Sequence, residues 1–288
     1  MRLVLLVVLA VAVALPAAPV PAAQEEDGTR AAFIKSRPPA PTAKKRPPRK
    51  PRRKPVPTPT PVNGSATAPV VPVASAGPVG LGFSLFQVFD RTTARRADPS
   101  SVFREGDHLR FVLESSIDGY LYIFLITRTK AGEKRPVMIY PDARLDEGDN
   151  FVYAHTVVEV PSRRNTKFDI FRITGEPATE QLFFVVSRDP LPGVPIAEEL
   201  VELCQGSPQS CPWSPAGAVW EPLERQASAE VRVSVRKDAG KAVSQGEDTA
   251  IAQRDLALGS SDEQPTVVAV SASSDAALLV RPVSIRHE

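Results

Sequence analysis

The densest group of potential metal ligands in the sequence is an acidic loop that follows a Tyr-Pro dipeptide. It offers five oxygen-bearing side chains, Asp142, Asp146, Glu147, Asp149 and Asn150. Hard cations such as Ca²⁺ prefer clustered carboxylate and amide oxygens. The spacing does not match an EF-hand, which favours a solvated acidic loop and leaves Asp146 and Asp149 as weak metal candidates.

Residues suited to acid–base or nucleophilic catalysis are present, but no local motif groups them. The three histidines, His108, His155 and His287, are far apart, and none has a second ligand at metal spacing. A Ser-His-Asp arrangement can still assemble in space, although no nucleophile elbow marks a serine. We therefore expect structural histidines and assign no catalytic residue and no cofactor. Whether the protein is an enzyme stays open, with a non-enzyme favoured.

Two cysteines, Cys204 and Cys211, are the only ones in the chain. In an oxidising compartment they are predicted to form a disulfide, which would stabilise the fold by about 2.5 kcal/mol. Two free thiols are the alternative, and a metal site is disfavoured because no His or second Cys pair lies nearby. Trp213 and Trp220 flank a Pro-rich turn beside the cysteines and are expected to pack over the disulfide; lining a binding groove is the alternative.

Positive charge is concentrated near the N-terminus. Between Gly28 and Phe89 there are eleven Lys or Arg and no Asp or Glu, whereas residues 90–288 carry a net charge of −7. We expect the stretch from Lys35 to Lys54 to bind anionic surfaces, such as acidic phospholipid headgroups or phosphorylated polysaccharide. The residues assigned to this binding are Lys44, Lys45, Arg46, Arg49, Lys50, Arg52, Arg53 and Lys54. The alternative is a charged spacer; nucleic acid offers similar phosphates, but an exported protein rarely meets it.

The first 22 residues have the pattern of a secretory signal. Arg2 precedes an apolar run from Leu3 to Leu15, and a small-residue pattern places the cut after Ala22. Thirteen apolar residues are too few to span a bilayer comfortably. We predict an exported protein, periplasmic or extracellular, with an uncleaved membrane anchor as the alternative.

Residues 23–80 are predicted to be a disordered linker. The segment RPPAPTAKKRPPRKPRRKPVPTPTPV combines dense proline with dense positive charge, so it cannot bury a core and is expected to be extended. Gly77, Gly80 and Gly82 are placed in the linker, without the strand-turn-helix context that a phosphate loop requires.

Residues 81–192 contain seven segments that are typical of β-strands. They cover residues 83–89, 108–115, 120–128, 136–140, 155–160, 168–173 and 181–187. Their number predicts a mainly β fold, an antiparallel β-sandwich or a small barrel. In the second segment Arg110 and Glu114 alternate with apolar residues, which predicts one wet face. The third is apolar on both faces and is expected to be central.

Residues 193–288 are predicted to form a C-terminal extension. Pro195 opens a short helix that ends near the cysteines, and a strand follows at 231–235. Two final strands, 266–272 and 277–286, are expected to form a terminal hairpin, with Pro282 on an edge strand. We expect these strands to add to the same sheet system.

Three ordered motifs between Phe103 and Leu191 resemble a known family. They are FREGDHLRFVLESSIDGYLYIF, MIYPDARLDEGDN and GEPATEQLFFVVSRDPL. The segment is similar to the domain of unknown function 4384 (DUF 4384), a bacterial module. Ala178-Thr179-Glu180 departs mildly from the Gly-Thr-Glu that the family usually carries there. The resemblance implies a compact β domain found beside kinase-like, protease-like and envelope-associated modules, with no activity of its own assigned.

Taken together, these features favour an exported, non-catalytic interaction module whose β body binds an envelope protein or glycan while the basic arm provides reach. An envelope hydrolase with a site built from scattered residues is the first alternative. A structural accessory of a secretion or surface assembly is the second. A sandwich or barrel hosts many functions, so the fold class alone does not decide among them.

Overall fold

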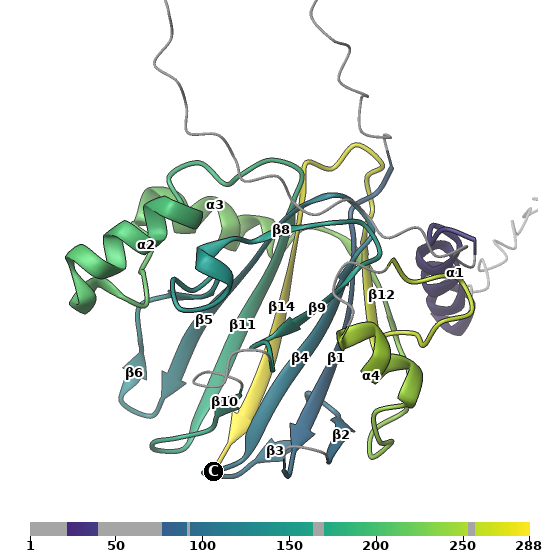
Figure 1. The fold of residues 1–288 in the computed structure, drawn as a ribbon, viewed down its shortest axis with the longest axis horizontal. Helices are drawn as coiled ribbons and strands as arrows, with labels where there is room; N and C mark the ends of the chain where they lie inside the picture. Colours follow the sequence, from purple (N-terminus) through teal and green to yellow (C-terminus); the bar gives the residue numbers. More distant parts are fainter. Residues whose placement is uncertain (1–21, 40–76, 91–92, 164–169, 253–256) are drawn as a thin grey trace, which may run out of the picture.

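The structure is a computed structural model that describes residues 22–39, 77–90, 93–163, 170–252 and 257–288. It is mainly β, with two mostly antiparallel sheets of seven strands each that pack face to face as a sandwich (Figure 1). The predicted sandwich is therefore confirmed, and the barrel alternative does not apply. No helix among these residues is long and apolar enough to cross a membrane.

Sheet A is antiparallel throughout and is built around β1 and β4. Its strand order is β10 (Phe171–Arg172), β4 (His108–Ser115), β1 (Gly80–Val88), β13 (Val267–Ser271) and β12 (Val231–Val235), with β2 (Ala94–Ala97) paired to β1 and β9 (Val157–Val160) paired to β4. The register pairs Phe83 with Leu113 and with Val267. A strand near the end of the chain, β13, therefore lies directly beside the first strand, β1.

Sheet B is built around the long strands β5 and β11. Its order is β3 (Val102–Phe103), β14 (Leu278–His287), β11 (Ala178–Ser187), β5 (Gly119–Thr129) and β6 (Gly132–Glu133), with β7 (Val137–Tyr140) and β8 (Phe151–Val152) also paired to β5. Only the short β3–β14 pair is parallel. The predicted central strand, β5, lies in the interior of this sheet.

The main core lies between the two sheets. Leu81, Phe83 and Leu85 point inward from β1 with the period of two that a strand imposes. They meet the inward residues of β11, and the rings of Phe83 and Phe184 stack at 5.1 Å. The other face of β5, with Tyr122 and Phe124, forms a second core beneath helices.

Helices cover the outer face of each sheet (Figure 1). Sheet B is covered by α2 (Ala197–Gly206) and α3 (Gly217–Gln226), with 3₁₀ turns η1 (Asp146–Gly148) and η2 (Pro208–Ser210) nearby. Sheet A is covered by α1 (Ala22–Lys35) and α4 (Gln245–Ala252). The Cys204–Cys211 disulfide, with 5.6 Å between the Cα atoms, joins α2 to the residue after η2, which confirms the predicted bond.

Two sequence predictions are corrected by the structure. The linker predicted for residues 23–80 is wrong at its start, where α1 packs on sheet A, and overlaps β1 by one residue at its end, Gly80. The terminal hairpin is also wrong, since β13 pairs in sheet A and β14 in sheet B. The C-terminal strands do join the main sheets, as expected, so residues 193–288 are part of the sandwich and not an appendage.

Pro282 lies where a missing N–H is tolerated. It pairs with Phe183 of β11, whereas on the other side of β14 only Arg286 and His287 pair with β3. At Pro282 this strand is thus an edge of the sheet as far as the described residues show, as its sequence predicted.

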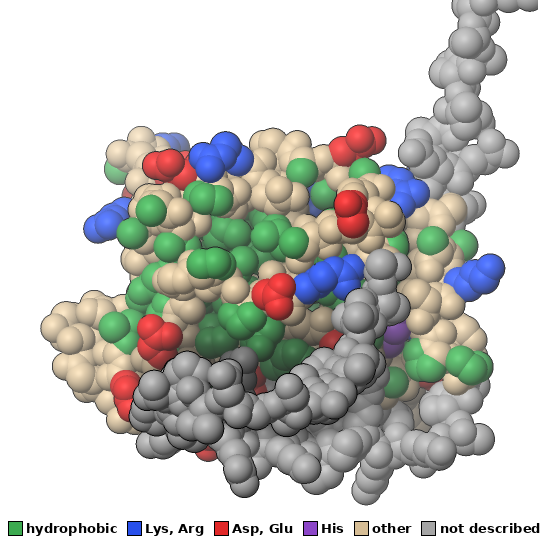
Figure 2. Space-filling view, turned by 90° about the horizontal axis from the view of Figure 1, so that it is seen from above, with side chains coloured by type: hydrophobic (Ala, Val, Ile, Leu, Met, Phe, Trp, Pro, Cys, Tyr) green, Lys and Arg blue, Asp and Glu red, His purple; other side chains and the backbone are tan. Residues whose placement is uncertain are grey.

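One end of the sandwich is shown in Figure 2, which looks along the vertical direction of Figure 1. Hydrophobic side chains gather in the middle of this face, and acidic and basic side chains are interspersed around them. The described part of this face therefore shows mixed charge, with no concentration of one sign.

Candidate functional site

The outer face of sheet A carries a site that holds helix α1. Two glycines of β1, Gly80 and Gly82, lie beneath the ring of Phe33: a Cβ on Gly80 would come 2.9 Å from its Cδ2 atom, and a Cβ on Gly82 would come 3.2 Å from its Cε1 atom. Only residues without a side chain leave room for the ring. We call the surface formed by Gly80, Gly82, Glu114, Val268 and Val270 the α1 site.

Helix α1 and the turn after it meet this site with residues spaced as one helical face. Phe33 and Ile34 are buried against Val268 and Val270 of β13. Arg30, one turn earlier, donates hydrogen bonds to the carbonyl oxygens of Ser234, Pro265 and Thr266. The positions i, i+3, i+4 and i+7 from Arg30 to Arg37 thus all engage the body.

Arg37 is the most deeply held of these residues. Its Nε and Nη2 atoms donate to the two carboxylate oxygens of Glu114 at 2.8 and 2.7 Å, and the side chains of the pair are 0% and 4% exposed. Its remaining hydrogens go to the carbonyl oxygens of Gly259, Asp262 and Glu263. All five donors of the guanidinium therefore have acceptors, which is what a buried arginine requires.

Glu114 also belongs to a hydrogen-bonded chain with a histidine and a serine. Its Oε1 atom lies 2.8 Å from Nδ1 of His155, and Nε2 of His155 lies 3.2 Å from Oγ of Ser36. This is the connectivity of a serine–histidine–carboxylate triad. The serine hydroxyl also lies 2.6 Å from the carbonyl oxygen of Phe33, so its single hydrogen serves either that oxygen or His155.

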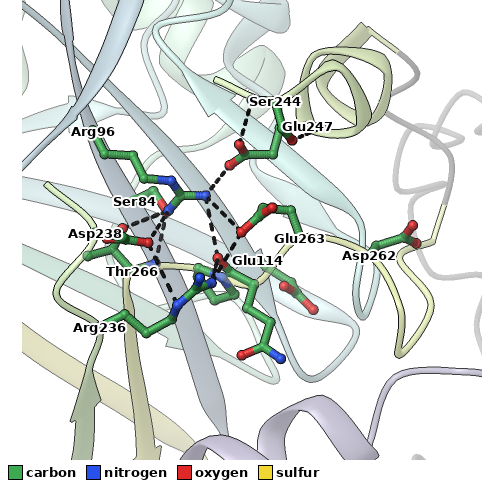
Figure 3. Close-up of polar contacts among 12 residues, drawn as sticks. Ser84, Arg96, Glu114, Arg236, Asp238, Ser244, Glu247, Asp262, Glu263 and Thr266 are labelled. Carbon is green, nitrogen blue, oxygen red and sulfur yellow. Dashed lines mark hydrogen bonds and ion pairs between the residues drawn. The ribbon is translucent and has the colours of Figure 1, made fainter. Parts of the chain in front are cut away.

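A second buried charge cluster lies beside the α1 site and is drawn in Figure 3. We call it the Arg96 cluster, and its members are Ser84, Arg96, Asp238, Glu247, Glu263 and Thr266. Arg96 donates to the hydroxyls of Ser84 and Thr266 at 2.7 Å and forms ion pairs with Asp238 at 3.3 Å and with Glu247. Arg236 approaches the same carboxylates, lying 3.2 Å from Glu263 (Figure 3).

Burial dominates the electrostatics of Glu247. Desolvation raises the pKa of this carboxyl above its usual value, although the positive charge of Arg96 and hydrogen bonds from Ser244 act in the opposite direction. The space between α4 and the sheet is a largely apolar cavity of about 40 Å³, too small for a substrate. The Arg96 cluster therefore connects β1, β2, α4 and the loop before β13 through its hydrogen bonds and ion pairs.

The wet face predicted for β4 is wrong. Arg110 and Glu114 are buried because α1 and α4 cover this face, and each has an ion partner: Arg110 lies 3.5 Å from Glu159, and Glu114 binds Arg37. The sequence placed Arg37 in a basic arm free to bind anions, which is likewise wrong. The only sequence signal for this site was the alternation of charge along β4. The alternation shows that Arg110 and Glu114 share one face of the strand, but it does not show that helices cover this face.

The remaining predicted site residues lie elsewhere. Lys44 to Lys54 lie outside the described residues. Asp149 accepts a hydrogen bond from the backbone N–H of Phe151, and the side chain of Asp146 is outside the description. No group of three or more His, Cys, Asp or Glu suited to a metal ion occurs among the described residues. Trp220 of α3 packs on Phe124 and Phe183, and Trp213 and Cys204 pack against the same apolar cluster.

The comparison with protein families identifies one region. Residues 102–190 match the family described as Domain of unknown function (DUF4384). This part of the chain is a DUF4384 domain. No curated protein and no solved structure matches the chain.

The DUF4384 region covers β3 to β11 and so contributes strands to both sheets. It contains Glu114 and His155, but their partners Ser36 and Arg37 lie before it. Five further strands in the described chain, β1, β2 and β12 to β14, also lie outside the match and pair directly with it or with one another. The α1 site is therefore assembled from the DUF4384 region and from the segments that flank it.

Proposed function

We propose that this protein is an exported, non-catalytic interaction module that binds a short amphipathic helix of a protein partner at the α1 site. The observation that carries the proposal is the docking of Arg30, Phe33, Ile34 and Arg37 on sheet A. Here the protein's own α1 occupies the site. The signal-like N-terminus and the disulfide support export.

The contacts of α1 are those of a helix-in-groove complex. Residues 40–76 separate the segment from β1, and the contacts described above are made by its side chains. Recognition thus depends on the face that the helix presents, with a central aromatic residue and an arginine at each end. This chemistry favours a protein partner over a glycan, because the site offers an apolar surface for an aromatic side chain and a buried carboxylate for an arginine.

The test uses the full chain with a specific protease site inserted within residues 40–76. After cleavage, we expect the N-terminal fragment to stay bound during gel filtration and to be displaced by a synthetic peptide of residues 22–39. Gly80→Val should release the fragment, because its side chain occupies the space of the Phe33 ring. Lys35→Ala is the matched control, since Lys35 is exposed on α1. Loss of the unmodified fragment on cleavage, or retention by Gly80→Val, would contradict the proposal.

We further propose that the basic stretch from Lys44 to Lys54 attaches the module to anionic envelope surfaces. Each basic residue near an anionic membrane contributes about 1 kcal/mol. Cosedimentation with anionic and neutral vesicles, comparing the full chain with a version lacking residues 44–54, tests this. We expect salt-sensitive binding to anionic vesicles by the full chain alone. Equal binding by both chains would contradict the proposal and show that the stretch acts only as a spacer.

A hydrolase is the second candidate, and the chain from Ser36 to His155 to Glu114 is the observation that favours it. It ranks below the binding module because Arg37 already binds both oxygens of Glu114. Labelling of the full chain with a fluorophosphonate probe tests this candidate, with Ser36→Ala as its control. Labelling that disappears in Ser36→Ala would establish a reactive serine and overturn the non-catalytic assignment.

A further inference from the structure

A separate cavity of about 210 Å³ lies between the two sheets, away from the α1 site. Its walls come from β4 and β10 of sheet A and from β5, β7, β11 and β14 of sheet B. Leu109, Phe111, Leu182 and Ile285 form its buried apolar surface. Leu125, Ile139 and Phe171 also line it but stay partly exposed, so apolar side chains reach the surface here.

One end of this cavity is polar. His287, the last residue of β14, is 2% exposed, and its Nε2 atom lies 3.4 Å from Oε1 of Glu180. The other oxygen of Glu180 accepts a hydrogen bond from the Thr127 hydroxyl at 2.7 Å. The carboxylate is thus engaged on both sides, and it holds the imidazole at the edge of the apolar space.

The second ring nitrogen of His287, Nδ1, differs from Nε2 in its surroundings. Nδ1 is buried and has no hydrogen-bond partner among the described residues. Buried polar atoms in folded proteins almost always have a partner, so an orphan atom in the lining of a cavity points to a missing ligand group. A single hydroxyl would satisfy Nδ1, since it can either donate or accept.

The size and charge of the cavity restrict the ligand further. An apolar cavity of about 150 Å³ is known to accept benzene, so this one has room for a single ring with a small substituent. The carboxylate of Glu180 lies beside His287 and disfavours an anionic ligand group at this end of the cavity, whereas the other charged residue of the lining, Arg172, is exposed. We propose that the cavity binds a small neutral molecule, a phenol or an alcohol with a short apolar body, whose hydroxyl pairs with Nδ1 of His287.

The test compares three ligands of matched shape: p-cresol, toluene and 4-methylbenzoate. Each is titrated into the full chain, and binding is followed through the methyl signals of Leu182 and Ile285 by NMR. We expect saturable shifts at these methyl groups, with p-cresol binding about fivefold to tenfold more tightly than toluene because of one hydrogen bond, and 4-methylbenzoate binding most weakly. Equal binding of p-cresol and toluene, tighter binding of 4-methylbenzoate, or no shift at these methyl groups would overturn the proposal.

Two variants separate the hydroxyl contact from the apolar pocket. His287→Phe should reduce p-cresol affinity to that of toluene, while His108→Phe, on β4 of the other sheet and outside the lining, should leave it unchanged. Leu125→Trp at the mouth should fill the space and abolish binding of both ligands. Unchanged p-cresol affinity in His287→Phe or in Leu125→Trp would refute the assignment. If His287→Phe does not fold, the p-cresol and toluene comparison in the unmodified chain and the Leu125→Trp variant still decide.

Discussion

Helices cover the outer faces of both sheets, but the two covers use different chemistry. On sheet B, α2 and α3 bury an apolar surface in which Trp220 packs edge-on against Phe124 and Phe183 at 5.8 and 4.9 Å. On sheet A, α1 and α4 are held largely by buried charges, among them the Arg37–Glu114 pair and the Arg96 cluster.

The difference predicts different roles for the two covers. Apolar burial contributes net stability in proportion to area, whereas a buried ion pair repays little beyond the cost of desolvating its charges. A buried pair does penalise a wrong partner heavily, because a mismatched helix leaves Glu114 without its counter-charge. We therefore expect the cover of sheet B to stabilise the fold and, under the proposed function, the cover of sheet A to select which helix docks.

The largest loss of stability is expected from Trp220→Ala on sheet B. Removing the indole leaves a cavity against Phe124 and Phe183, which should lower the free energy of unfolding by about 3–5 kcal/mol. Urea unfolding followed by circular dichroism measures this loss. A loss below about 1 kcal/mol would show that the cover of sheet B is not the main source of stability.

On sheet A, Glu114→Ala should lower the free energy of unfolding by about 3 kcal/mol, because the buried guanidinium of Arg37 then has no carboxylate to neutralise its charge. The combined Arg37→Met and Glu114→Gln variant should recover much of this loss, since neither charge then remains buried. Glu105→Ala, at an exposed position, is the control and should change stability by less than about 0.5 kcal/mol. A double variant as unstable as Glu114→Ala would assign the loss to packing.

Removing the disulfide with Cys204→Ser and Cys211→Ser should cost about 2.5 kcal/mol on the chain-entropy account. The bond closes a short loop at the end of α2, which covers sheet B. The same denaturation with and without a reducing agent checks the value in the unmodified chain. Equal stability of oxidised and reduced protein would show that the packing of α2 suffices alone.

The smallest effect concerns the pH dependence contributed by Glu247. Burial raises its pKa in the folded protein, so the folded state binds this proton more tightly than the unfolded state. The resulting stabilisation is complete below the ordinary pKa of 4.5 and is lost as the pH rises through the folded value. The melting temperature of the unmodified chain relative to Glu247→Gln should therefore fall as the pH rises through this window. A difference that grows with pH would mean that the ion pair with Arg96 outweighs burial.

The strand segments could be predicted because each carries its own signal. The apolar residues on both faces of residues 120–128 required a strand covered on two sides, and the structure places Ile123 in the core between the sheets and Phe124 beneath the helices. The docking of α1 could not be predicted. Its sequence has only two large apolar residues among those that contact sheet A, Phe33 and Ile34, and a short helix of this kind is stable only through tertiary contacts.

The amino-acid sequence by itself determined the longer β strands, the disulfide and the DUF4384 resemblance, because alternation, cysteine spacing and turn motifs are local properties of a chain; the short strands β2, β3, β6 and β8 carry no such signal. Tertiary structure alone decided which charges are paired. Arg37 and Glu114 are 77 residues apart, and Glu180 and His287 are 107 apart. Residues that pair across such distances leave no periodic pattern in the sequence. Whether a charged group or a ring nitrogen has a partner depends on which atoms folding brings within about 3 Å of it.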